Sequence, residues 1–148
     1  MTKDDLAGYL KEHKRGEIHL IFLNDAISRI LRLGLKNDEL ELFKDSLMYF
    51  DTDKRVHCID EENNLYPALS KIIPHNCIYE MKYEHEKMDE SLRNIKSMTQ
   101  TIEQLAQTNL LMVKLKVEVR SFIHLISNHI AKENQYLELI RNKEASFR

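Results

Sequence analysis

Three histidine–glutamate pairs stand four residues apart in this chain, and two of them, His57 with Glu61 and His129 with Glu133, are candidates for metal binding. On an α-helix, this spacing places both side chains on one face, one turn from each other. An imidazole nitrogen and a carboxylate oxygen placed in this way can bind one metal ion or two adjacent ones. Leu65 continues the four-residue spacing after Glu61, which predicts that the first pair faces the apolar interior. Buried charged groups are costly unless something binds them, so the pattern indicates a buried metal site.

A single pair of this kind is weak evidence, because a solvated histidine–carboxylate pair on a helix surface is the more common arrangement. Two further histidines, His19 and His85, strengthen the metal hypothesis, because each lies on another predicted helix. His19 shares an apolar stripe with Leu23 and Ile27, although a hydrogen-bonded core histidine is the alternative interpretation. His13 is the alternative ligand on the same helix, and its more polar neighbours lead us to prefer His19.

The composition predicts one all-helical domain over residues 1–148. The chain has only three glycines and two prolines, so material for turns is scarce, and its length suits a single core. The formal net charge of -2 and the absence of a basic cluster argue against nucleic-acid binding. No apolar run approaches the roughly 18 residues of a membrane span. Cys58 and Cys77 form no CxxC motif and the start is not a signal peptide, so we expect a cytoplasmic protein.

Turn and cap signals divide the chain into four predicted helices. In antiparallel helices that follow one another, residues at one level lie about equally far from the connecting turn. The midpoints between successive members of the series His19, His57, His85 and His129 all fall in or beside predicted turns. The sequence therefore predicts an up-down-up-down antiparallel four-helix bundle with these four histidines at one level. The predicted helices run from Thr2 to about Leu33, from about Glu39 to Tyr66 or Leu69, from near His75 to between Met98 and Asn109, and from Leu110, after a Thr108–Asn109 cap, to about Lys143.

At these residues the chain resembles the hemerythrin-like (HHE cation-binding) family, over nearly its whole length. The resemblance is carried by His57-xxx-Glu61-Glu62-xx-Leu65-Tyr66-Pro67, by Glu84-His85-Glu86 and by His129-Ile130-xx-Glu133. The family implies a four-helix bundle that encloses a non-haem di-iron centre. By this resemblance, His19, His57, His85 and His129 are terminal metal ligands, and Glu61 and Glu133 bridge the two ions.

The ligand types suit the implied cofactor. Imidazole and carboxylate without thiolate favour iron or manganese, and zinc is compatible with them. The expected cofactor is two non-haem iron ions with an oxo or hydroxo bridge, and open positions on them would take O2, NO or peroxide. The oxygen carriers of the family have a further histidine on the third helix, whereas the positions one turn from His85 are Met81 and Asp89 here. This difference disfavours reversible oxygen carriage and leaves Asp89 as an alternative additional ligand.

We therefore expect a non-haem di-iron protein that binds or senses O2, NO or related oxidants. The second hypothesis is a stress-response enzyme that acts on peroxide or NO, or that donates iron for repair of iron–sulfur centres. The repair proteins usually carry an N-terminal cysteine-containing domain, which these 148 residues do not include. The third hypothesis is a metal-free helical interaction module. The sequence identifies no protein partner.

Overall fold

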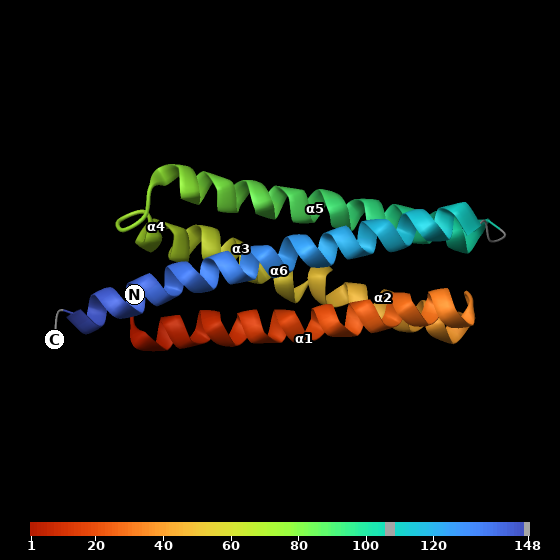
Figure 1. The fold of residues 1–148 in the computed structure, drawn as a ribbon, viewed down its shortest axis with the longest axis horizontal. Coiled ribbons are helices and arrows are strands. Elements are labelled where there is room, and N and C mark those ends of the chain that lie inside the picture. Colours follow the sequence, from red (N-terminus) through yellow and green to blue (C-terminus); the bar gives the residue numbers. More distant parts are fainter. Residues whose placement is uncertain (106–108, 147–148) are drawn as a thin grey trace.

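The computed structural model describes residues 1–105 and 109–146, with side chains described to residue 143. All its regular elements are helices, which confirms the all-helical prediction, and they form four rods (Figure 1). The first, third and fourth rods are single long helices, and the second is a succession of four short ones. Their bounds are α1 Lys3–Leu33; α2 Asn37–Asp51, α3 Asp53–Asp60, the π-helix η1 Glu61–Leu65 and α4 Tyr66–Leu69; α5 His75–Gln104; and α6 Asn109–Ser146.

The predicted helix ends follow from capping chemistry. Before α1, the Thr2 hydroxyl accepts the Asp5 backbone N–H at 3.1 Å, and the Asp5 carboxylate accepts the Thr2 N–H at 2.9 Å. This reciprocal pair is a capping box with aspartate in place of the usual glutamate. Gly34 follows α1 with φ 85°, a backbone conformation that favours glycine. Pro74 is the N-cap of α5, and α6 begins at Asn109, while the predicted cap at Thr108 lies outside the described residues.

The second rod departs from the single helix that the sequence predicts. At Thr52 the backbone leaves helical geometry, with φ -119° and ψ -83°, which separates α2 from α3. At η1 the backbone hydrogen bonds join residues five apart instead of four, so the Tyr66 N–H donates to the Glu61 carbonyl. Pro67 has no N–H to donate and its ring crowds the carbonyl four residues before it. The wider turn directly before Pro67 lets the rod continue past the proline, and it lies between Glu61 and Tyr66.

The apolar interior consists of two clusters with a polar layer between them. On α1, one cluster holds Leu6 and Tyr9 and the other begins at Leu20. On α6, the clusters meet between Ile130 and Leu137. Buried histidines and glutamates lie in or directly beside the corresponding interval on every rod. They are His13, His57, Glu61, His85, His129 and Glu133. Water is thus kept from the layer by apolar side chains on both sides.

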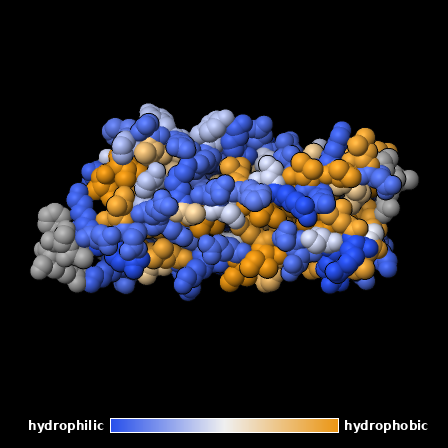
Figure 2. All heavy atoms as spheres, in the orientation of Figure 1, coloured by the Kyte–Doolittle hydropathy of each residue, from blue (hydrophilic) through white to orange (hydrophobic). Residues whose placement is uncertain are grey.

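The surface is mixed in character. Figure 2 shows a largely hydrophilic face, with hydrophobic side chains gathered mainly toward the end that holds the α1–α2 turn. Exposed apolar side chains include Ile21 and Phe22 on α1 and Val117 on α6. Across the described ranges, the structure contains no helix with the length and apolar character that a membrane span requires. Both cysteines are free thiols.

Candidate metal centre

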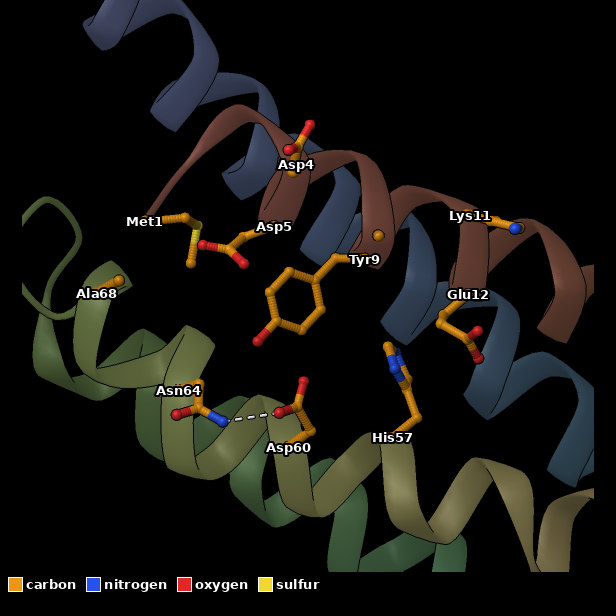
Figure 3. A pocket seen from close by; sticks show the side chains of 11 residues that line it. Met1, Asp4, Asp5, Tyr9, Lys11, Glu12, His57, Asp60, Asn64 and Ala68 are labelled. Atoms are coloured by element: carbon orange, nitrogen blue, oxygen red, sulfur yellow. Dashed lines mark hydrogen bonds between the residues drawn. The ribbon is translucent and has the colours of Figure 1, made fainter.

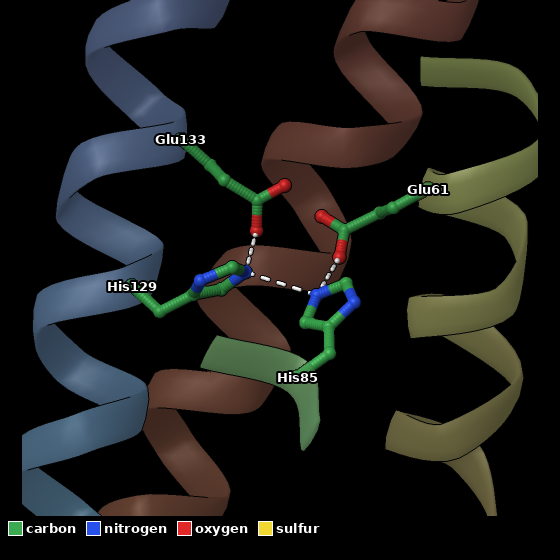
Figure 4. Close-up of side chains that lie close together, drawn as sticks. All are labelled: Glu61, His85, His129 and Glu133. Carbon is green, nitrogen blue, oxygen red and sulfur yellow. Dashed lines mark hydrogen bonds and ion pairs between the residues drawn. The ribbon is translucent and has the colours of Figure 1, made fainter. Parts of the chain in front are cut away.

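Six buried side chains from all four rods form the polar layer. His13 comes from α1, His57 and Glu61 from the second rod, His85 from α5, and His129 and Glu133 from α6, and each residue is at most 7 % exposed. They form two groups whose ligand atoms lie within 4.8 Å of one another. The first group is Glu61, His85, His129 and Glu133 (Figure 4), and the second is His13, His57 and Glu61.

Glu61 belongs to both groups because its two carboxylate oxygens face different histidines. Glu61 Oε2 lies 3.2 Å from the Nε2 atoms of both His13 and His57. Glu61 Oε1 lies 3.2 Å from Nε2 of His85. A carboxylate with its oxygens divided in this way is positioned to serve two neighbouring metal ions.

Glu133 faces the same space from α6. Its Oε1 lies 2.5 Å from Nε2 of His129 and 3.9 Å from Nε2 of His13. The Nε2 atoms of His129 and His85 are 3.0 Å apart. The polar atoms of the layer thus converge on one small volume, as Figure 4 shows for four of the six side chains.

Two of the rings are oriented through their second nitrogen. Nδ1 of His129 lies 2.7 Å from Glu84, and the Lys132 ammonium donates to the same carboxylate at 2.6 Å. Nδ1 of His13 lies 2.6 Å from the side-chain oxygen of Asn134. Both acceptors require an N–H at Nδ1, so a neutral ring presents a lone pair at Nε2, toward the cluster. Metal-binding histidines are held in this way by a carboxylate or an amide behind the ring.

These lone pairs point at carboxylate oxygens. The Nε2 atom of His13 faces Glu61, and that of His129 faces Glu133. Neither atom of such a pair carries a proton when the ring is neutral and the carboxyl is ionised, so the two repel at these distances. A cation must therefore lie between them, either a proton or a metal ion.

Several buried polar atoms in the layer also lack a hydrogen-bond partner among the described residues. They are Nε2 of His57, Oε1 of Glu61, Nδ1 of His85 and both oxygens of Glu133. Buried polar atoms are nearly always paired, and leaving one unpaired costs about 1–3 kcal/mol. Imidazole and carboxylate together are a donor set for iron, manganese or zinc. The residues present therefore fit a metal centre.

The two carboxyl groups differ in charge when no metal is bound. Burial and the negative charge of Glu61 raise the pKa of Glu133 well above its ordinary value. Burial also acts to raise the pKa of Glu61, but its close interactions with Glu133 and with the surrounding histidines outweigh burial and hold that pKa well below the ordinary value. In the metal-free layer Glu133 therefore holds a proton to higher pH than Glu61 does, and a metal ion would compete with that proton.

Tyr66 closes the layer beside His85. Its hydroxyl lies 3.1 Å from His85 Nε2, and the two rings stack with centroids 5.6 Å apart and planes 23° apart. Burial raises the pKa of Tyr66 far above its ordinary value, so the hydroxyl keeps its proton and can donate it. The π turn of η1 separates Glu61 from Tyr66, and turns of this kind are frequent at functional sites.

A groove between α1 and the second rod leads to the His57 side of the layer (Figure 3). Its volume is about 580 Å³, and Tyr9 and His57 line it together with the carboxylate of Asp60. The ring centroids of Tyr9 and His57 are 6.1 Å apart. The groove is wide enough for hydrated ions or small molecules to approach His57 from solvent.

The structure brings five of the six predicted ligands together and places His19 elsewhere. The His19 ring stacks on Tyr49, with centroids 3.8 Å apart and planes at 4°. His13, the alternative that we did not prefer, occupies the expected place in the layer. Gly16 made the His13 side of α1 look polar in the sequence, but Gly16 is buried and a side chain there would meet Ile130 of α6 at 3.5 Å. That side of α1 is therefore a close helix contact, which corrects our choice of His19.

The structure also separates groups that the sequence left undecided. Asp89, the alternative additional ligand, is 48 % exposed, lies 3.7 Å from Arg55 and belongs to neither metal-capable group. The sequence pattern did not reveal Glu84 and Asn134 as partners of the ligand rings. The sequence indicates them only by position, because Glu84 directly precedes His85 and Asn134 directly follows Glu133.

Comparison with known proteins agrees with this arrangement. A family model described as "Hemerythrin HHE cation binding domain" matches residues 5–139, a range that includes all six residues of the layer. The match confirms the resemblance noted in the sequence. Neither the curated proteins nor the solved structures yielded a significant match.

Proposed function

We propose that this chain, which belongs to the hemerythrin HHE cation-binding domain family, holds two non-haem iron ions in its buried layer and there binds or senses O2, NO or a related oxidant. One observation carries the proposal. His13 and His129, each held through Nδ1 by a side-chain oxygen, direct their Nε2 atoms at the carboxylates of Glu61 and Glu133. This is the donor arrangement that a pair of metal ions would satisfy.

The proposed ligand set follows the two groups in the structure. His13 and His57 hold one ion, His85 and His129 hold the other, and Glu61 and Glu133 are shared between them. Four imidazoles and two carboxylates are fewer donors than two six-coordinate ions require, so positions remain for water-derived bridges and a small external ligand. Iron would supply the reversible change of oxidation state on which oxidant binding or sensing depends.

Other residues keep the ligands in place. Glu84, itself paired with Lys132, and Asn134 fix the orientation of two rings, and the apolar clusters on both sides exclude water. The proposal includes one domain over residues 1–148 and the up-down-up-down order of the rods. That order brings one histidine from each rod to a single level.

Metal analysis and visible spectra test the proposal. Freshly purified protein should contain roughly two iron ions per chain. The reduced protein should bind NO, and in air it should oxidise to a form that only an added reductant reverses. A protein without iron, manganese or zinc would refute the metal centre and favour the helical interaction module. Return to the reduced spectrum on removal of oxygen would show oxygen carriage instead. Turnover of peroxide or NO faster than by free iron would favour the stress-enzyme hypothesis.

A further inference from the structure

The groove between α1 and the second rod meets the buried layer at one residue. Among the described residues that line the groove, His57 alone belongs to the layer. The residue is 7 % exposed, and its Nε2 atom is buried without a hydrogen-bond partner, 3.2 Å from Glu61 Oε2 inside the layer. The His57 ring therefore borders the groove on one side and the layer on the other. A metal ion that comes through this groove meets His57 before any other ligand of the layer.

The groove carries an excess of negative charge. Its carboxylates are those of Asp4, Asp5, Glu12 and Asp60, and its cationic groups are Lys11 and the amino group of Met1. Figure 3 shows the His57 ring between the carboxylates of Glu12 and Asp60, whereas the Lys11 side chain extends away from them. A cleft lined mainly by one sign of charge raises the local concentration of ions of the opposite sign. The groove therefore favours cations, and it does so most directly beside His57.

The negative charge of Asp60 remains available to a cation, because neutral groups hold its carboxylate. The Asn64 side chain donates to Asp60 Oδ1 at 2.7 Å. Burial and a hydrogen bond to Asp60 raise the pKa of Tyr9, so the Tyr9 hydroxyl keeps its proton and is a neutral donor. Asp53 of the same helix, in contrast, pairs with an arginine at 2.7 Å. Neither Asp60 nor Glu12 forms an ion pair with any residue that the structure describes.

The size of the groove suits a hydrated divalent ion. Six water molecules occupy roughly 180 Å³ at about 30 Å³ each, and the groove has a volume of about 580 Å³. A second cavity, which His85 lines, has a volume of about 70 Å³ and is too small for such an ion. Of these two openings beside the layer, the groove at His57 is thus the one that a hydrated metal ion can enter.

We propose that this groove is the entry site of the metal centre, where Glu12 and Asp60 capture a hydrated divalent cation and pass it to His57 as its water molecules are lost. The site rests on the proposed metal centre and adds to it a route and a first set of ligands. Because these two carboxylates lie outside the layer, they affect how fast metal is bound. They do not affect how much metal the layer finally holds.

Two kinds of variant test the entry site, one by charge and one by size. Glu12→Gln combined with Asp60→Asn removes two groove charges. Asp25→Asn combined with Asp45→Asn is its matched control, since it removes two exposed carboxylates, one from α1 and one from the second rod. Gly8→Leu narrows the groove, because Gly8 lines it and a Cβ added there meets open space. Leucine and alanine are both better helix formers than glycine, so Gly8→Leu keeps the fold and Gly8→Ala is its control.

The measurement is the rate of iron uptake. Each metal-free protein is mixed with ferrous iron without oxygen, free iron is trapped with a chelator at intervals, and bound iron is measured at low and at high salt. The Glu12→Gln/Asp60→Asn variant should take up iron roughly 10-fold more slowly at low salt and approach the wild-type rate at high salt, where exposed charges are screened. Gly8→Leu should be slow at both salt concentrations. The two control variants should match the wild type, and every variant should finally hold roughly two iron ions.

The outcomes separate the entry site from the metal centre. Wild-type uptake rates in both Glu12→Gln/Asp60→Asn and Gly8→Leu would overturn the proposal. A lower final iron content in the doubly neutral variant would also overturn it, because Glu12 or Asp60 would then hold a resident ion. Absence of iron uptake by the wild type would refute the metal centre and its entry site together, whereas full iron content at unchanged rates would refute the entry site alone.

Discussion

His13→Ala should remove one of the two metal ions, and His19→Ala should remove neither. His13 belongs to the group of three ligands, whose other members are His57 and Glu61. Its loss leaves His57 as the only histidine for that ion, beside the shared carboxylates Glu61 and Glu133, while the second ion keeps both of its histidines. Iron content should therefore fall from roughly two ions per chain to roughly one in His13→Ala and stay near two in His19→Ala.

The two substitutions should also differ in their effect on the metal-free fold. His13→Ala removes buried contacts of 2.6 Å to Asn134 and 3.2 Å to Glu61, and it leaves the Asn134 side-chain oxygen without this partner while Glu61 keeps His57 and His85, at a cost of about 2–3 kcal/mol in the free energy of unfolding. For a domain of this size, that change lowers the melting temperature by roughly 5–10 °C. His19→Ala loses one ring stacked on Tyr49, which contributes about 0.5–1.5 kcal/mol.

The assay combines elemental analysis with melting curves recorded with iron and with a chelator. Because the folded state alone forms the site, bound metal raises the melting temperature, and the gain grows with the logarithm of the metal concentration relative to Kd. The gain on iron loading should be much reduced in His13→Ala and fully retained in His19→Ala. Full iron content in His13→Ala, or an equal loss of iron in the two variants, would refute the assignment of His13 as a ligand.

Three further predictions concern the carboxylates and Tyr66. Glu61→Ala should empty both groups, whereas Glu133→Ala should leave the group around His13 partly loaded; near-full iron in Glu61→Ala would contradict its shared position. In the metal-free protein, the raised pKa of Glu133 means that the folded state retains a proton above the ordinary value of 4.5, so stability falls as pH rises from there toward the raised pKa. Glu133→Gln, which is neutral at every pH, should flatten this fall above about pH 4.5 in denaturant titrations, and an unaltered slope would count against the raised pKa. Tyr66→Phe should keep the iron content and lower the free energy of unfolding of the metal-free protein by about 1 kcal/mol, while loss of iron would indicate that Tyr66 is itself a ligand.

The sequence predicted the level of the polar layer better than it predicted the face of each helix. Helix ends depend on local capping and on glycine and proline, so the intervals between turns can be read from residues such as Thr2, Gly34 and Pro74. Residues that lie equally far from a turn on two successive antiparallel helices then share one level of the bundle. On α1, however, His13 and His19 differ by six residues, and the midpoint of either with His57 falls in the first turn. Level alone therefore could not distinguish them.

Choosing between these two histidines required knowledge of which side of α1 meets α6. Gly16 reads as polar or neutral in a hydropathy pattern, yet in the fold it is buried and a side chain there would contact Ile130 of α6 at 3.5 Å. His19, although it shares a stripe with buried Leu23 and Ile27, lies at the edge of that stripe and stacks on Tyr49. The side of α1 that faces inward depends on the helices that pack against it, and a single sequence does not identify those contacts.

The second rod shows how one local irregularity joins the ligand layer to its surroundings. In a regular α-helix each residue turns by about 100°, so Tyr66, five residues after Glu61, would not face the same side as Glu61. The backbone hydrogen bonding of η1 joins residues five apart and so adds one residue to the turn. Glu61 and Tyr66 therefore both face inward, and the Tyr66 hydroxyl lies 3.1 Å from His85 Nε2. Periodicity assumes a constant turn and cannot indicate this shift, but Pro67 gives a physical reason for it, since a proline disrupts the regular bond to the residue four before it. Pro67, which directly follows one of the two predicted ends of the second helix, Tyr66, thus stands beside the wide turn that places a hydroxyl donor near the proposed metal ligand.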